Sequence, residues 1–148
     1  MSERVTQTAF WRIAISAILA IVALGSLSGY LSESGYSNDW FAALDKPWFM
    51  PPGWMFGLVW TALYALIGLA LALIWIAPDS PVRSRGLLLF FAQLGVNFAW
   101  SPIFFGARMI EIGLLAIILM FALAALNFEI GRLNPGSDAM PLGIFGDL

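Results

Sequence analysis

The chain has 148 residues, of which 61% are hydrophobic and 11% charged, and a mean hydropathy of +0.88; soluble domains carry about 25% charged residues, so this composition indicates one membrane-embedded domain. The net charge of -2 comes from seven basic and nine acidic residues, and the basic ones are too scattered to predict nucleic-acid binding. The absence of cysteine and histidine excludes disulfides, thiolate nucleophiles, histidine bases, Cys/His zinc sites and haem ligation through Cys or His.

The first apolar stretch lies between Arg12 and Glu33. A helix needs about 20 apolar residues to cross a hydrocarbon core, so this stretch predicts a transmembrane helix over about 13–31. A cleaved secretory signal is the alternative interpretation. The stretch is longer than the usual hydrophobic region of a signal, and no clear A-x-A cleavage site follows, so we expect the helix to be retained.

The second apolar stretch opens with a proline-rich loop that contains the run Lys46-Pro47-Trp48-Phe49-Met50-Pro51-Pro52. Indole rings favour the boundary between membrane and water, and a proline is tolerated in the first turn of a helix. We therefore predict a second helix over about 52–77, which we expect Pro78 and Pro81 to end. The loop residues expected to form a lid are Trp40, Lys46, Pro47, Pro51 and Pro52.

Three aromatic residues of the second helix, Phe56, Trp60 and Tyr64, recur at i, i+4 and i+8 and so share one face. Such a face can serve helix packing or contact with lipid. It can also form an aromatic wall that holds a large flat ligand, whose orientation is then fixed by a few polar groups. The spacing by itself leaves both interpretations open.

A third helix is predicted over about 86–105, with Pro102 near its end, where a kink is tolerated. Its residues Gln93, Asn97, Trp100 and Phe104 lie on one face. An unpaired amide in the hydrocarbon zone costs several kcal/mol, so both amides need partners. They either join helices to one another or line a ligand pocket that Trp100 covers.

A small-residue pattern on this third helix, Gly95-x-x-x-Ala99, predicts a helix contact, either inside the bundle or in a homodimer.

The last helix is predicted over about 111–131. The expected fold is an all-α integral membrane protein with four transmembrane helices in one domain, 1–134, followed by a disordered tail over 135–148. Basic residues gather on the cytoplasmic side of membrane proteins, so we expect a cytoplasmic N-terminus. The basic residues on that side would be Arg4, Arg12, Arg83, Arg85 and Arg132, with Lys46 and Arg108 opposite.

Several short motifs, taken together, resemble the tryptophan-rich sensory protein family (TspO/MBR), whose animal members are the translocator proteins, once called peripheral benzodiazepine receptors. The motifs are Trp40-Phe41-x-x-Leu44-x-Lys46-Pro47, then Pro51-Pro52, then Val59-Trp60-x-x-Leu63-Tyr64, then Gln93-Leu94-x-x-Asn97-x-x-Trp100-x-Pro102-x-Phe104-Phe105-Gly106.

The resemblance implies a helical bundle, often homodimeric through its third helix, with a pocket under the first loop that binds porphyrins and, in some members, sterols. Carried over, it places Trp60, Asn97 and Trp100 in the pocket. Phe41 stands where the family usually has Tyr, which removes a hydroxyl from the lid region. The family has five transmembrane helices, whereas four are predicted here, because the region of its helices four and five is shortened.

Taken together, the predicted ligand-binding residues are Phe41, Phe56, Trp60, Tyr64, Gln93, Asn97, Trp100 and Phe104, with no catalytic residue and no metal ligand. The predicted function is a membrane receptor or carrier for porphyrin-type tetrapyrroles, with protoporphyrin IX or haem as ligand and no required cofactor. The expected partners are the lipid membrane and a second copy of the chain. The alternatives are a light-dependent porphyrin-degrading enzyme and a structural or regulatory membrane subunit with an incomplete pocket.

Overall fold

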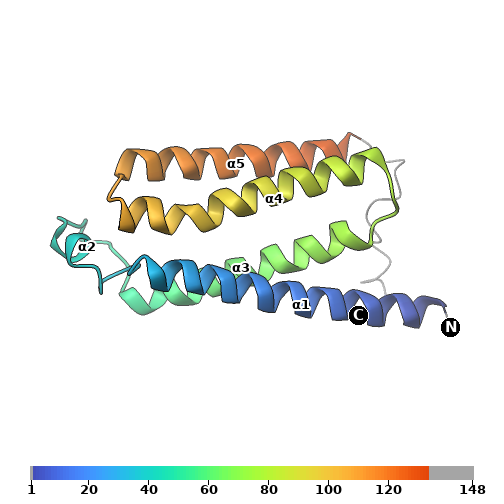
Figure 1. Ribbon diagram of the computed structural model, residues 1–148, viewed down its shortest axis with the longest axis horizontal. Helices are drawn as coiled ribbons and strands as arrows, with labels where there is room; N and C mark the ends of the chain where they lie inside the picture. Colours follow the sequence, from blue (N-terminus) through green and yellow to red (C-terminus); the bar gives the residue numbers. More distant parts are fainter. Residues whose placement is uncertain (1, 134–148) are drawn as a thin grey trace.

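The computed structural model describes the backbone of residues 2–133, and the predicted tail over 135–148 lies outside the described residues. The chain forms helices throughout this part (Figure 1). They are α1 (Ser2–Leu31), α2 (Asp39–Ala43), α3 (Gly53–Ile76), α4 (Pro81–Ser101), the π-helical turn η1 (Pro102–Gly106) and α5 (Ile110–Arg132).

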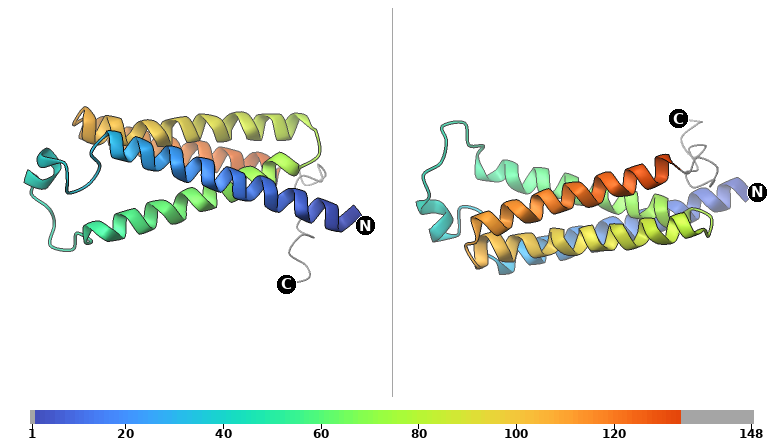
Figure 2. Two further views of the ribbon diagram at one scale, coloured as in Figure 1. Left: turned by 60° about the horizontal axis from the view of Figure 1, so that its bottom comes forward. Right: turned by 90° about the horizontal axis from the view of Figure 1, so that it is seen from above.

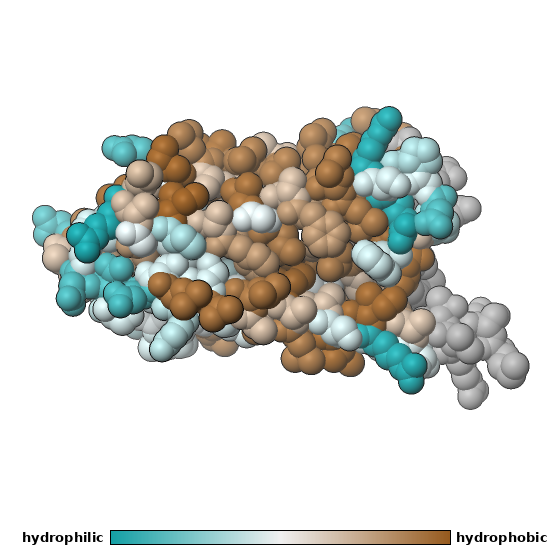
Figure 3. All heavy atoms as spheres, viewed as in Figure 1, coloured by the Kyte–Doolittle hydropathy of each residue, from teal (hydrophilic) through white to brown (hydrophobic). Residues whose placement is uncertain are grey.

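Four segments of the described chain are long and apolar enough to cross a membrane: Gln7–Leu31, Gly53–Ile76, Pro81–Gly106 and Ile110–Arg132. Figure 3 shows hydrophobic residues across the middle of this face and hydrophilic residues gathered toward its two ends. Large apolar side chains in the middle of the helices, such as Leu19 and Phe121, are exposed, as lipid contact requires. The predicted fold class and the number of spanning helices are confirmed.

Two predicted helix starts are wrong. Helix α1 begins at Ser2, about eleven residues earlier than expected, because residues 2–12 contain neither glycine nor proline to interrupt it. Helix α4 begins at Pro81 and not near residue 86. The Ser80 hydroxyl caps this helix by accepting a hydrogen bond from the Arg83 N–H at 3.1 Å. Pro81 therefore starts α4 in addition to following the end of α3.

The helices form two closely packed pairs, α1 with α3 and α4 with α5, and contacts between the pairs are sparser. Helix α1 crosses α3 at Gly68, where a Cβ atom would come within 2.6 Å of the Ile18 Cα. Beyond this crossing the two helices diverge toward the α2 end of the molecule (Figure 2). The absence of a side chain at Gly68 thus allows the close approach, and the divergence gives α4 access to both helices.

A buried apolar cluster joins the two pairs. It consists of Ile21 of α1, Tyr64 of α3, and Phe90 and Leu94 of α4. A second cluster, formed by Phe10, Ala14 and Ala72, fixes α1 against α3 on the other side of the crossing. The first cluster lies next to the aromatic residues that the sequence singles out, so the helix core also positions the candidate site.

Candidate functional site

Four of the predicted ligand-binding residues form one continuous series of rings, which we call the aromatic wall: Tyr64, Trp60, Trp100 and Phe104. The ring centroids of Tyr64 and Trp60 are 5.7 Å apart, and those of Trp60 and Trp100 are 5.6 Å apart. Trp100 and Phe104 are stacked at 5.0 Å with an interplanar angle of 11°. The i, i+4 spacing within α3 and within α4–η1 places each pair of rings on one face, and tertiary packing brings the two faces together.

Helix α5 contacts Trp100 and Phe104, the two rings of the wall that α4 and η1 provide. The Trp100 indole N–H donates to the Gly113 carbonyl oxygen at 3.1 Å. A Cβ atom at Gly113 would lie 2.9 Å from the Phe104 ring, so glycine is needed for this ring to reach its position. The indole plane of Trp100 is thereby fixed by both a hydrogen bond and a stacking partner.

The amide of Asn97 is the main polar group near the wall. Asn97 is 8% exposed, and its Oδ1 atom has no hydrogen-bond partner among the described residues. A buried, unpaired carbonyl oxygen costs about 1–3 kcal/mol by mutational measures. Of the two roles predicted for the amides, the joining of helices is performed by another residue: Asn127 of α5 donates to the Gly86 carbonyl of α4 at 3.2 Å. Gln93 is half-buried and no hydrogen bond of its side chain is seen within the described chain.

A short segment that contains α2 covers the η1 end of the wall. Asn38 caps α2 by accepting from the Phe41 N–H at 3.1 Å, and its Nδ2 donates to the Phe105 carbonyl at 3.4 Å. Phe41 is buried, with its ring 5.2 Å from that of Phe105 and 6.4 Å from that of Phe104. Trp40 contacts Phe104 edge-on at 5.8 Å. These contacts fix the predicted lid residue Trp40 and the predicted ligand-binding residue Phe41 against the wall.

Lys46 stabilises this covering segment. Its ammonium donates to the carbonyl oxygens of Phe41, Ala42 and Leu44 at 2.6, 3.0 and 3.0 Å. It also lies 4.8 Å from the centre of the Phe41 ring. A cation near the C-terminal carbonyls of a helix is favourable, so the role of Lys46 in this structure is to cap α2.

The remaining predicted site residues lie apart from the wall. Phe56 is half-buried on the part of α3 that diverges from α1, and no aromatic ring contacts it within the described residues. The lid prolines Pro47, Pro51 and Pro52 are exposed. Gly95 is exposed with no atom within 4 Å of an added Cβ, and Ala99 is half-buried, so the surface of α4 at Gly95 is open.

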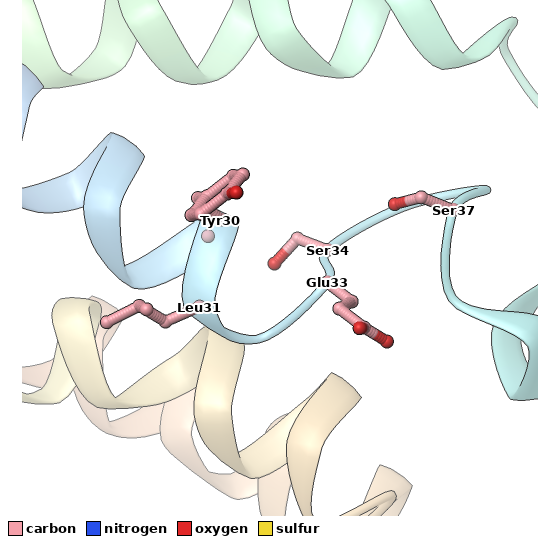
Figure 4. Close-up of a pocket in the computed structure, with 6 residues that line it drawn as sticks. Tyr30, Leu31, Glu33, Ser34 and Ser37 are labelled. Carbon is pink, nitrogen blue, oxygen red and sulfur yellow. The ribbon is translucent and has the colours of Figure 1, made fainter.

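A hollow of about 510 Å³ lies at the end of α1 (Figure 4). It is lined by Gly29, Tyr30, Leu31, Glu33, Ser34 and Ser37. The predicted ligand-binding residues are not among them, so the hollow and the aromatic wall are separate features. Trp60, Trp100 and Phe104 are each partly exposed.

Two contributors to the site were not predicted from the sequence. Asn38 precedes Asp39-Trp40, and an Asn followed by an acidic residue is a helix N-cap signal that predicts α2. Ser28 of α1 donates from its hydroxyl to the Phe98 carbonyl of α4 at 2.6 Å. No sequence pattern indicates this second contact, because its residues are 70 positions apart.

The described residues hold no group of three Asp or Glu side chains close enough for a metal ion. The wall consists of aromatic rings in contact, and Asn97, with its unpaired amide oxygen, lies one helical turn before Trp100 on α4.

Comparison with known proteins places this geometry in context. The family model described as the TspO/MBR family matches residues 17–137. The tryptophan-rich protein TspO of Archaeoglobus fulgidus is 39% identical over 109 residues, which are 72% of this chain and 68% of that protein.

Two further relatives extend the comparison. Protein CrtK of Rhodobacter capsulatus is 29% identical over 133 residues, covering 70% of this chain and 83% of the relative. The human translocator protein is 36% identical over 105 residues, covering 70% of this chain and 62% of the relative. All four spanning helices fall largely within the region matched by the family model.

Proposed function

Because the chain belongs to the TspO/MBR family of multi-pass membrane proteins, we propose that it is a receptor or carrier for flat, porphyrin-type tetrapyrroles. The names of its relatives, tryptophan-rich sensory protein and translocator protein, refer to sensing and to translocation of a ligand. Either role begins with binding, which the aromatic wall supports.

The observation that carries this proposal is the combination of the wall with Asn97. Trp60, Trp100 and Phe104 are partly exposed, and their rings would provide stacking surface for a macrocycle. Asn97, one helical turn before Trp100, has a buried oxygen without a donor. A group on the ligand periphery, such as the hydroxyl of a sterol or a protonated carboxyl group of a porphyrin, would supply that donor. Binding would then remove the cost of the unpaired oxygen as well as bury apolar surface.

The protein provides neither Cys nor His for iron, so haem would be held through its ring and not through these axial ligands. Free-base protoporphyrin IX needs no axial ligand and is therefore a better probe than haem for binding through the ring. The covering segment with Trp40 and Phe41 would shield the bound ring at the η1 end of the wall.

The test is quenching of tryptophan fluorescence by protoporphyrin IX in the dark, with the protein in detergent. We expect saturable quenching that Trp60→Phe and Asn97→Ala each weaken. Trp75→Phe is the matched control, because Trp75 is an exposed indole on the same helix near its other end. Linear, non-saturating quenching in all variants would contradict the proposal and favour a structural or regulatory subunit.

Light-dependent degradation of porphyrin is the second candidate function. The observation that favours it is the contact between two indoles, since the ring centroids of Trp60 and Trp100 are 5.6 Å apart. The same samples, illuminated in air, distinguish the two functions. Loss of porphyrin absorbance in the light, reduced by Trp60→Phe and absent in the dark, would support degradation. Stable absorbance under both conditions would leave binding alone.

A further inference from the structure

Pro102 interrupts the hydrogen bonding of α4 close to the aromatic wall. In an α-helix the N–H of residue 102 would donate to the carbonyl of Phe98, but proline has no N–H. The chain passes into the π-helical turn η1 at this residue. A carbonyl that loses its donor inside a bilayer costs several kcal/mol unless another group replaces it.

The replacement comes from a different helix. The Ser28 hydroxyl of α1 donates to the Phe98 carbonyl oxygen at 2.6 Å, and Ser28 is half-buried. The next serine, Ser32, directly follows the end of α1 and forms the ordinary alternative: its hydroxyl donates back to the Ser28 carbonyl of α1 at 2.7 Å. Two serines four residues apart thus make similarly short bonds, one across helices and one back to α1.

Ser28 acts together with Gly25, three residues earlier on the same face of α1. Gly25 contacts α3, since its missing Cβ leaves room for the Tyr64 ring, whose Cε2 would otherwise be 2.3 Å away. Ser28 contacts α4 at Phe98, and the Phe98 ring lies 6.1 Å from the Tyr64 ring. One face of α1 therefore contacts both helices that form the wall, α3 at Gly25 and α4 at Ser28.

We infer that Ser28 is a positioning residue of the proposed site: its hydroxyl supplies the donor that Pro102 lacks and so holds Trp100 and Phe104 of the wall at their distance from Trp60. This inference rests on the proposed binding function. Without the bond α4 is freer to move relative to α1 and α3. The ligand must then order the wall on binding, which lowers its affinity.

The experiment is a double-mutant cycle between Ser28 and Pro102, because Pro102→Ala restores the helical N–H and makes the Ser28 hydroxyl redundant. The dissociation constant of protoporphyrin IX is measured in the dark, and the near-ultraviolet circular dichroism of the indoles is recorded without ligand. We expect Ser28→Ala to raise Kd about five-fold, equivalent to about 1 kcal/mol. In the Pro102→Ala background the same change should alter Kd less than about two-fold.

Two controls separate positioning from general stability. Ser28→Thr keeps the hydroxyl and should restore the Kd and the indole dichroism of the wild type. Ser32→Ala removes the same atoms four residues later in the chain without breaking a bond between helices, and should leave Kd within about two-fold. If Ser28→Ala cannot be purified, Ser28→Cys replaces it, since a thiol is a weak donor of similar shape.

An unchanged Kd in Ser28→Ala or in its Cys substitute overturns the inference, as does an equal loss in the presence and absence of Pro102. Absence of saturable binding in the wild type contradicts the proposed function instead. The inference is then judged by the dichroism: non-additive changes in the Ser28 and Pro102 variants support it, and additive changes overturn it.

Discussion

Gly25 of α1 lies directly against the Tyr64 ring of α3, so that a Cβ atom on Gly25 would come within 2.3 Å of the ring carbons. A similar contact occurs about two turns of α1 farther from the α2 end, where a Cβ on Gly68 would lie 2.6 Å from the Ile18 Cα. The atoms that an added Cβ would meet differ between the two sites: a side-chain ring at Gly25 and a backbone atom at Gly68. A ring can rotate or shift, whereas a backbone atom moves only with its helix, so the two glycines should respond differently to a methyl group.

We predict that Gly68→Ala lowers the free energy of unfolding by about 1–3 kcal/mol, because it separates α1 from α3. Gly25→Ala should cost less and mainly displace Tyr64. Gly95→Ala is the control: no atom lies within 4 Å of its Cβ, so the better helix propensity of alanine should make it neutral or stabilising by up to about 1 kcal/mol. The measurement is unfolding in detergent followed by circular dichroism. Equal stability of the Gly68 and Gly95 variants would contradict the close crossing.

Glu33 ends α1 in a conformation that favours glycine. Its φ is 50°, its N–H donates to the Tyr30 carbonyl at 3.1 Å, and the Ser34 N–H donates to the Gly29 carbonyl at 2.9 Å, which together form a Schellman motif. We predict that Glu33→Gly raises the free energy of unfolding by about 0.5–1 kcal/mol relative to Glu33→Ala. Both variants remove the negative charge from the helix end, so their difference reports the backbone strain. An alanine variant as stable as the glycine variant would exclude such strain.

Arg83 closes the turn between α3 and α4. Its Nε donates to the Ile74 carbonyl at 3.2 Å and its Nη2 to the Trp75 carbonyl at 2.8 Å, while Asp79, its ion-pair partner at 2.5 Å, is almost fully exposed. An exposed ion pair contributes little, whereas the two carbonyl contacts cap the end of α3.

We therefore predict that Arg83→Lys, which cannot span both carbonyls, lowers the melting temperature clearly, while Asp79→Asn changes it little. Thermal unfolding at low and at high salt checks this. A large, salt-sensitive effect of Asp79→Asn would show instead that the ion pair dominates.

The absence of native cysteine makes the predicted orientation directly testable. With a cytoplasmic N-terminus and four spans, the loop that contains Ser37 lies on the non-cytoplasmic side, and Ser84, in the first turn of the third span, lies at its cytoplasmic end. Both residues are exposed. We predict that a membrane-impermeant maleimide labels Ser37→Cys in intact cells and labels Ser84→Cys only after permeabilisation. The reverse pattern would invert the topology, and labelling of both in intact cells would contradict the number of spans.

The membrane class, the four spanning helices and the residues that share each helical face could be predicted from the amino-acid sequence. Apolar length decides which segments cross a bilayer, and the 3.6-residue period decides which side chains share a face, so both follow from local order along the chain. The pairing of Trp60 with Tyr64 and of Trp100 with Phe104 follows from this period, because each pair is four residues apart.

How these faces meet depends on the packing of the helices in three dimensions. The contact of Trp60 with Trp100, the unpaired Asn97 oxygen and the Ser28–Phe98 hydrogen bond depend on where α1 crosses α3 and how α4 lies against both. These positions are set by close approaches at individual glycines and by a proline that leaves a carbonyl without its donor. The spacing of residues along the chain does not predict these positions, because they depend on contacts between helices that are far apart in the sequence.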